Sequence, residues 1–159
     1  MIHKPMLGWR EWLALPELNI ARIKAKIDTG ARSSALHAFA IEPYRKGGQR
    51  WIMFAMHPLQ ERTDILVECH AQVKDRRWVS DSGGHKQRRY VIETQLIAGQ
   101  SVVRAEMTLT NRDNMRFRML LGRTAMDNRF IIDPSSSYLL GKPGAVEGSR
   151  LQEQERITL

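Results

Sequence analysis

Apolar residues alternate with charged or polar ones from Ala21 to Asp28, and the alternation ends in the pair Thr29-Gly30. A period of two places the apolar residues on one face of a β-strand, and that face packs against a core. Such a strand carries Asp28 into a tight turn at its end. The hydroxyl of Thr29 can brace this turn, and Gly30 lets the backbone approach the carboxylate closely. The pattern predicts a half-buried strand that presents an aspartate in a fixed position.

The Asp28-Thr29-Gly30 turn has two interpretations. Asp and Gly are common turn residues, so the tripeptide can be a hairpin corner with a solvated aspartate. In the other interpretation the carboxylate is held beside a second carboxylate, and the pair shares one proton and acts on a water as base and acid. The tripeptide alone does not decide between the two.

The period of two recurs along most of the chain, with turns at short intervals, which predicts an all-β fold. Residues 1–140 are expected to form one domain with a single short helix at Thr124–Asn128, and residues 141–159 a flexible polar tail. Hairpin turns are expected at Arg45–Gln49 and Ala98–Gln100. The expected strands are Glu11–Leu15, Ala21–Asp28, Ala35–Pro43, Arg50–His57, Ile65–Val73, Arg77–Ser80, Arg88–Ile97, Ser101–Asn111, Met119–Leu121 and Phe130–Asp133.

The composition suits a soluble globular protein, because 42% of the 159 residues are hydrophobic and 26% are charged. No apolar run approaches the roughly 18 residues of a membrane helix, and the N-terminus lacks the apolar segment of a secretory signal. The one cysteine, Cys69, cannot form an intrachain disulfide. A cytoplasmic protein without membrane contact is expected.

The chain is strongly basic, with a net charge of +8 and a pI of about 10.1. This balance indicates an anionic partner such as RNA, an acidic peptide or a nucleoprotein surface. The alternative is that the excess of basic residues only keeps the surface soluble.

A second element, Leu120-Leu121-Gly122-Arg123, follows far downstream. A glycine at the end of an apolar strand is typical of a place where two backbones nearly touch. Taken alone, the element could be any core strand that meets a turn. In this order, however, with the Asp28 turn before it and a helix-sized segment after it, the pair resembles the signature of retropepsin-like aspartic peptidases.

The closer resemblance is to a bacterial family labelled ATP-dependent zinc proteases and associated with the ribosomal-modification glutamate ligase. It extends from about Gly8 to Leu139 and so covers nearly the whole domain. The residues that carry it are Ile27–His37, Asp75–Arg77, Arg89–Ile92 and Leu109–Met115, the last leading into the Leu-Leu-Gly-Arg element.

This resemblance implies a closed, barrel-like half of a pepsin that works as a homodimer, with Asp28, Thr29 and Gly30 of both copies forming the catalytic centre. The hydroxyl of Thr29 would lock the paired turns across the dimer, and Asp75–Tyr90 would be a flap over the substrate. The implied substrate-binding residues are Ala31, Arg76, Arg77, Arg88 and Arg89, and the supporting residues are Leu120, Leu121, Gly122 and Arg123. The stretch between Asp28 and Gly122 is longer than in compact viral relatives, so it must hold additional hairpins.

The second carboxylate has a candidate within the chain, because Asp81-Ser82-Gly83 superficially matches a second catalytic motif. It follows Ser80 rather than a buried residue, precedes Gly84-His85-Lys86, and has no Leu-Leu-Gly element of its own. A polar hairpin tip is the better interpretation. Two copies of Asp28 are therefore needed, which makes dimerisation a requirement of the mechanism.

The zinc and ATP of the family label find little support in the sequence. His-Glu-x-x-His is absent, and the histidines at 3, 37, 57, 70 and 85 lack ligand spacing. Cys69 and His70 are neighbours in a strand, so they should be a buried thiol and a surface imidazole. A zinc site from distant His37 and His70 stays open as an alternative. No phosphate-binding Gly-Lys-Ser/Thr loop is present, so no metal or cofactor is expected, and any nucleotide dependence would come from a partner ligase.

The function that these observations favour is an aspartic peptidase acting on acidic or poly-glutamate tails of a ribosomal protein. The cations of the expected flap would attract a polyanionic peptide, or they are solvated charges that prevent edge pairing. The alternatives are a non-catalytic module that binds an acidic peptide or the ribosome surface, and a zinc-dependent peptidase.

Overall fold

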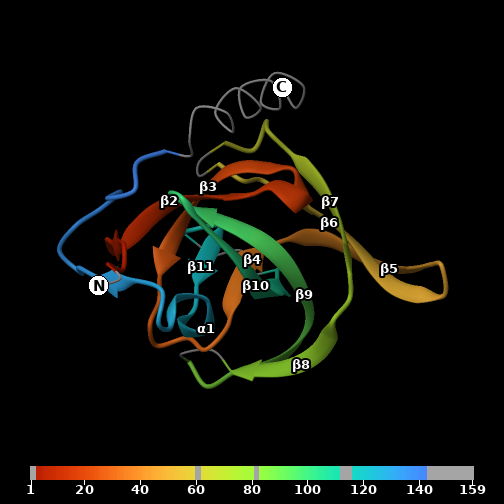
Figure 1. The fold of residues 1–159 in the computed structure, drawn as a ribbon. Coiled ribbons are helices and arrows are strands. Elements are labelled where there is room, and N and C mark those ends of the chain that lie inside the picture. Colours follow the sequence, from red (N-terminus) through yellow and green to blue (C-terminus); the bar gives the residue numbers. More distant parts are fainter. Residues whose placement is uncertain (1–2, 60–61, 81–82, 112–115, 143–159) are drawn as a thin grey trace.

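The computed structural model of the chain describes residues 3–59, 62–80, 83–111 and 116–142, and its regular secondary structure is almost entirely β-strand (Figure 1). This confirms the all-β prediction. Within these described residues, one short α-helix, α1 (Arg123–Met126), and one 3₁₀ turn, η1 (Pro16–Leu18), interrupt the strands. The strands are β1 (Met6–Leu7), β2 (Arg10–Leu15), β3 (Ile20–Ile27), β4 (Ser34–His37), β5 (Phe39–Lys46), β6 (Gln49–Met56), β7 (Val67–Gln72), β8 (Asp75–Ser80), β9 (Lys86–Ala98), β10 (Ser101–Thr110), β11 (Met119–Leu121) and β12 (Ile131–Ile132).

Seven strands form the main sheet, in the order β10-β4-β11-β3-β2-β9-β8. Strand β9 also pairs with β10, so the hydrogen-bonded neighbours can be followed from β10 through β4, β11, β3, β2 and β9 back to β10. The pairing between β2 and β9 is the shortest in the ring, because it consists of the single pair Ala14 and Ile97. This arrangement is consistent with the barrel-like fold that the resemblance to retropepsin-like peptidases implies, and β8 extends the sheet beyond the ring.

A second sheet of three strands, β5-β6-β7, extends from the ring as a long arm (Figure 1). Strands β5 and β6 are joined at Gly47 and Gly48, whose φ angles of 59° and 77° are those of a two-residue hairpin turn. The hairpin predicted at Arg45–Gln49 is therefore confirmed. The β9–β10 hairpin is confirmed as well, since Ala98 pairs with Ser101 across Gly99-Gln100.

The prediction of one continuous strand at Ala35–Pro43 is wrong. The chain changes sheets at Ala38, between β4, which pairs with β10 and β11, and β5, which pairs with β6. Ala40 has a positive φ of 50°, and the β5–β6 register shifts at this point. The residues at the break, Ala38, Phe39 and Ala40, include no glycine, proline or polar turn residue, so the sequence pattern alone does not locate it.

The core lies between the strands of the ring and reaches under β6 and β7. It contains large side chains that are wholly or almost wholly buried: Leu13, Leu15, Ile23, Leu36, Phe54, Ile92, Leu96, Met119 and Leu121. In the described part of the chain, no helix has the length and apolar character needed to cross a membrane. The tail predicted for residues 141–159 lies, from residue 143 on, outside the described residues.

Candidate active site

The turn after β3 holds Asp28 through its backbone and its own carboxylate. The Asp28 N–H donates to the carbonyl of Leu121 (2.9 Å), and the carbonyl of Asp28 accepts from Ala31 N–H (3.3 Å). The Gly30 N–H donates to Asp28 Oδ1 at 3.1 Å, which orients the carboxylate within the turn. Asp28 is half-buried, whereas Thr29 and Gly30 are exposed. The carboxylate is therefore fixed at the surface, where a second group can meet it.

Strand β11 passes beneath this turn, between β3 and β4. Leu121 pairs with Ile27 in parallel, and Leu120 pairs with Ala35 in antiparallel orientation. At the end of β11, the Gly122 N–H donates to Ser34 Oγ (3.0 Å). A Cβ atom on Gly122 would lie 2.4 Å from the carbonyl carbon of Ser33, so only glycine fits. This is the close backbone approach that the sequence predicts for the Leu-Leu-Gly element.

The two residues that follow Gly122 donate hydrogen bonds to backbone carbonyls of the Asp28 turn. Arg123 N–H donates to Ala31 O (2.7 Å), and the Arg123 guanidinium donates through Nη1 to Thr29 O (3.1 Å). Thr124 donates to Arg32 O through both its backbone N–H and its hydroxyl, each at 3.0 Å. The turn is therefore clamped from Thr29 to Arg32 by the start of α1, which is the support expected of Arg123.

The hairpin of β8 and β9 divides the four predicted substrate-binding arginines between two faces. Arg77 is paired with Arg89, whereas Arg76 is paired with Tyr90 and Arg88 with Trp78. Because neighbouring strand residues point to opposite faces, Arg77 and Arg89 lie on one face and Arg76 and Arg88 on the other. The four do not form one cationic surface.

Arg89 is almost entirely buried, with 7% of its surface exposed, and burial lowers the pKa of its guanidinium. Its Nη1 donates to Thr108 Oγ1 (3.3 Å), and the Thr108 hydroxyl donates to Ser34 O (3.3 Å). Since Ser34 also receives the Gly122 N–H, these contacts connect the β8–β9 hairpin to the crossing beneath Asp28. The sequence did not single out Ser34 and Thr108 as site residues, although hydroxyls at buried strand positions indicate a hydrogen-bonding role.

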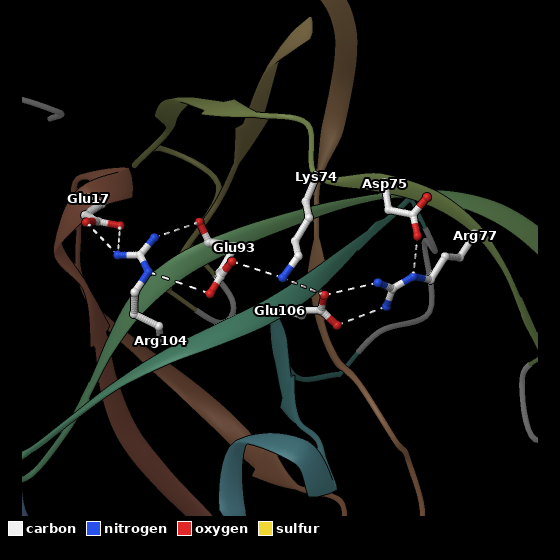
Figure 2. A network of polar contacts seen from close by, with 7 residues as sticks. All are labelled: Glu17, Lys74, Asp75, Arg77, Glu93, Arg104 and Glu106. Atoms are coloured by element: carbon white, nitrogen blue, oxygen red, sulfur yellow. Dashed lines mark hydrogen bonds and ion pairs between the residues drawn. The ribbon is translucent and has the colours of Figure 1, made fainter. Parts of the chain in front are cut away.

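Arg77 belongs to a network of alternating charges along β8, β9 and β10 (Figure 2). Both of its terminal nitrogens bind Glu106 at 3.0 Å, and its Nε binds Asp75 at 2.6 Å. Lys74 lies between Glu106 (3.1 Å) and Glu93 (3.0 Å). The hydrogen bond from Arg77, together with that from Lys74, lowers the pKa of Glu106 to about 2. At the far end, Arg104 binds Glu17 at 3.1 Å.

The predicted buried thiol and surface imidazole are confirmed. Cys69 is 1% exposed and donates to Leu18 O (3.3 Å), and burial raises its pKa to about 12. His70 is exposed, with Nδ1 2.9 Å from Tyr44 Oη. His37, the second histidine of the alternative zinc site, lies in β4 of the seven-stranded sheet, whereas His70 lies in β7 of the three-stranded sheet. Among the described residues, no group of three or more His, Cys, Asp or Glu side chains is placed to hold a metal ion.

The comparisons with known proteins agree with this geometry. A family described as "Retropepsin-like aspartic endopeptidase RimB" matches residues 6–143. Two relatives, from Shewanella pealeana (43% identical, 94% of this chain) and Parasynechococcus marenigrum (44%, 89%), are each named "Probable alpha-L-glutamate ligase". The chain spans only 32% and 30% of their respective lengths. A crystal structure of a Legionella pneumophila protein of unknown function superposes with a TM-score of 0.71 at 25% identity, covering 87% of this chain and 99% of the other.

Proposed function

The chain belongs to the RimB-like family of retropepsin-like aspartic endopeptidases, and we propose that it hydrolyses peptide bonds as a homodimer through two Asp28 carboxylates. The observation that carries this proposal is the fixed Asp28 turn, which is held by Leu121 O and by its own Gly30 N–H. One chain supplies one such turn. A second copy would bring the partner carboxylate that a shared proton requires.

In this mechanism the two carboxylates bind a water molecule between them. The ionised carboxylate accepts a proton from the water as it attacks the scissile carbonyl carbon, and the protonated one donates to the carbonyl oxygen. The carboxylate that took the water proton then donates it to the amide nitrogen as the C–N bond breaks, and a hydroxyl of the tetrahedral intermediate returns a proton to the other carboxylate. Gly30 N–H keeps Asp28 Oδ1 in place throughout. Thr29, which is exposed, would bridge the two turns through its hydroxyl.

The test is Asp28→Asn, which keeps the shape of the side chain and removes its ability to take a proton. We expect peptidase activity to fall at least about a hundredfold, with the oligomeric state unchanged in analytical ultracentrifugation. Asp64→Asn, which removes an exposed carboxylate paired with Arg62, is the matched control and should keep full activity. Full activity in the Asp28→Asn dimer would show that the aspartic mechanism is wrong.

We further propose that the substrate is a glutamate-rich peptide, such as the tail of a ribosomal protein, and that a glutamate ligase is the functional partner. Two observations support this: the net charge of +8, and the fact that about a third of each curated relative named as a glutamate ligase matches this chain. Arg32 is exposed at the turn itself and can attract carboxylates. Added salt should therefore reduce kcat/KM steeply for a glutamate-rich peptide and little for a neutral one. Equal salt dependence for both would overturn the substrate class.

A second candidate is a non-catalytic module that presents acidic peptides to a ligase. The names of the relatives favour it, since they refer to a ligase and not to a peptidase. This candidate requires Asp28→Asn to leave both peptide binding and ligase-dependent function intact. A zinc-dependent peptidase is distinguished by chelation: activity lost with chelator, recovered with zinc and retained in Asp28→Asn would establish it.

A further inference from the structure

One face of the β8–β9 hairpin combines exposed aromatic rings with basic side chains. We call it the outer face, and its cross-strand pairs are Arg76 with Tyr90, Trp78 with Arg88, and Ser80 with Lys86. Trp78 has 69% of its surface exposed, the highest value among the large hydrophobic side chains found exposed in the described chain. The guanidinium of Arg76 lies over the Tyr90 ring, 4.7 Å from its centroid. The three pairs span four residue steps, about 13 Å.

Two hollows open on this face. Trp78, Ser80 and Lys86 line the first. The second, with a volume of about 260 Å³, lies where Tyr90 meets the β5–β6 arm. Its other lining residues are Pro43, Tyr44, Arg45, Arg50 and Val73. Among the described residues, neither lining contains an acidic side chain, so both hollows suit a ligand that carries negative charge beside planar groups.

The carboxylates that the structure describes near these strands, Asp75 and Glu106, lie on the opposite face of the hairpin. Asp75 and Glu106 bind Arg77 there (Figure 2). Strand alternation thus leaves the cations of the outer face without these partners, and within the described residues no carboxylate forms an ion pair with Arg76, Lys86 or Arg88. An ordinary solvated surface mixes positive and negative side chains. The described part of the outer face instead places three basic side chains next to an exposed indole.

We propose that the outer face binds single-stranded RNA. A base would stack on Trp78 while Lys86 and Arg88 contact the adjacent phosphates, and a second base would enter the hollow beside Tyr90. Unstacked bases on aromatic and arginine planes are the usual mode of single-strand recognition. An acidic peptide would use the cations alone and would gain nothing from an indole exposed to this extent. A duplex keeps its bases stacked and could reach only the cations.

The test measures the fluorescence anisotropy of a labelled single-stranded RNA of about 12 nucleotides with the full chain. We expect Trp78→Ala to weaken binding about tenfold or more, because one stacked base is lost, and Trp78→Phe to retain most of it. Arg88→Ala should reduce the slope of log K against log salt by about 0.7, the value for one phosphate contact. The matched controls are Val102→Ala, which truncates another exposed apolar side chain, and Lys4→Ala, which removes one exposed charge elsewhere.

Tight binding of wild type that is lost in Trp78→Ala and kept in both controls supports the proposal. Equal weakening by Lys4→Ala and Arg88→Ala would mean that net charge alone binds RNA, and would overturn it. A glutamate-rich peptide of equal charge that binds as tightly as the RNA, with or without Trp78, would also overturn it in favour of a peptide surface. Since Asp28 lies outside the outer face, Asp28→Asn should bind RNA like wild type. This result separates the RNA proposal from the proposed peptidase activity.

Discussion

Gly122 and Ser33 approach each other so closely that a Cβ atom on the glycine would lie 2.4 Å from the Ser33 carbonyl carbon and 2.5 Å from its oxygen. Both neighbours are fixed, because β11 is paired on both sides and Gly122 N–H is bound to Ser34. The contact is between backbones, so no side-chain rotation can relieve an added methyl group. The position of the Asp28 turn therefore depends on the absence of a side chain at Gly122.

Gly122→Ala should destabilise the protein by more than about 3 kcal/mol or prevent folding, because a sheet strand has to move. Gly30→Ala is the matched control, since its added Cβ would meet Asp28 Oδ1 at 3.4 Å, an ordinary contact. Urea unfolding of both variants measures the difference. If Gly122→Ala unfolds at the same urea concentration as wild type, the close approach is wrong.

Arg123→Ala should lower kcat while KM stays nearly constant. The guanidinium donates to Thr29 O from an exposed position, so its loss should cost under about 1 kcal/mol of stability. It would, however, free the turn that orients Asp28, which makes Arg123 a positioning residue. Steady-state kinetics on one peptide, with Arg123→Lys expected to recover part of kcat, checks this. A change confined to KM would point to substrate contact instead.

Glu11→Gln should destabilise the protein by about 2 to 4 kcal/mol. Glu11 is 0% exposed, and its carboxylate accepts backbone N–H groups from Gly8 (2.7 Å), Leu139 (3.0 Å) and Leu140 (3.1 Å). An amide replaces one accepting oxygen with a donor that faces other donors. Denaturant unfolding should show the loss, and hydrogen exchange should rise at Leu139 and Leu140. The exposed Glu68→Gln should change stability by less than about 0.5 kcal/mol.

Glu106→Gln should reduce stability in a pH-dependent way. The pKa of Glu106 is lowered by Arg77 from about 4.5 to about 2, so the folded state favours the ionised form. The contribution is complete above pH 4.5 and is lost as the pH falls toward 2. We expect wild type to exceed the variant by about 1 to 2 kcal/mol at pH 7, allowing for partial solvent screening.

The difference between wild type and Glu106→Gln should shrink between pH 4.5 and 2, and thermal unfolding across this range measures it. Glu42→Gln, which alters an exposed carboxylate on β5, is the control. A difference that stays constant with pH would mean that Arg77 does not act on the charge of Glu106.

The strand into Asp28 and the Leu-Leu-Gly element could be predicted from sequence because each is local: one is a period of two, the other a glycine after apolar residues. Arg89 could not. A cation in a strand suggests a solvated position, and only the distant hydroxyl of Thr108 explains its burial. Glu11 was missed for the same reason, since its three partners come from both ends of the described domain.

Strand β11 has only three residues, yet it lies between β3 and β4, which precede it in the sequence by about 90 residues. Until it arrives, β3 and β4 have no shared neighbour, and Asp28 N–H lacks the Leu121 carbonyl. Contacts of this sequence separation form slowly. A partly folded chain that lacks β11 therefore has no anchor for the backbone of Asp28, and the Asp28 turn is completed only when this short strand joins the sheet.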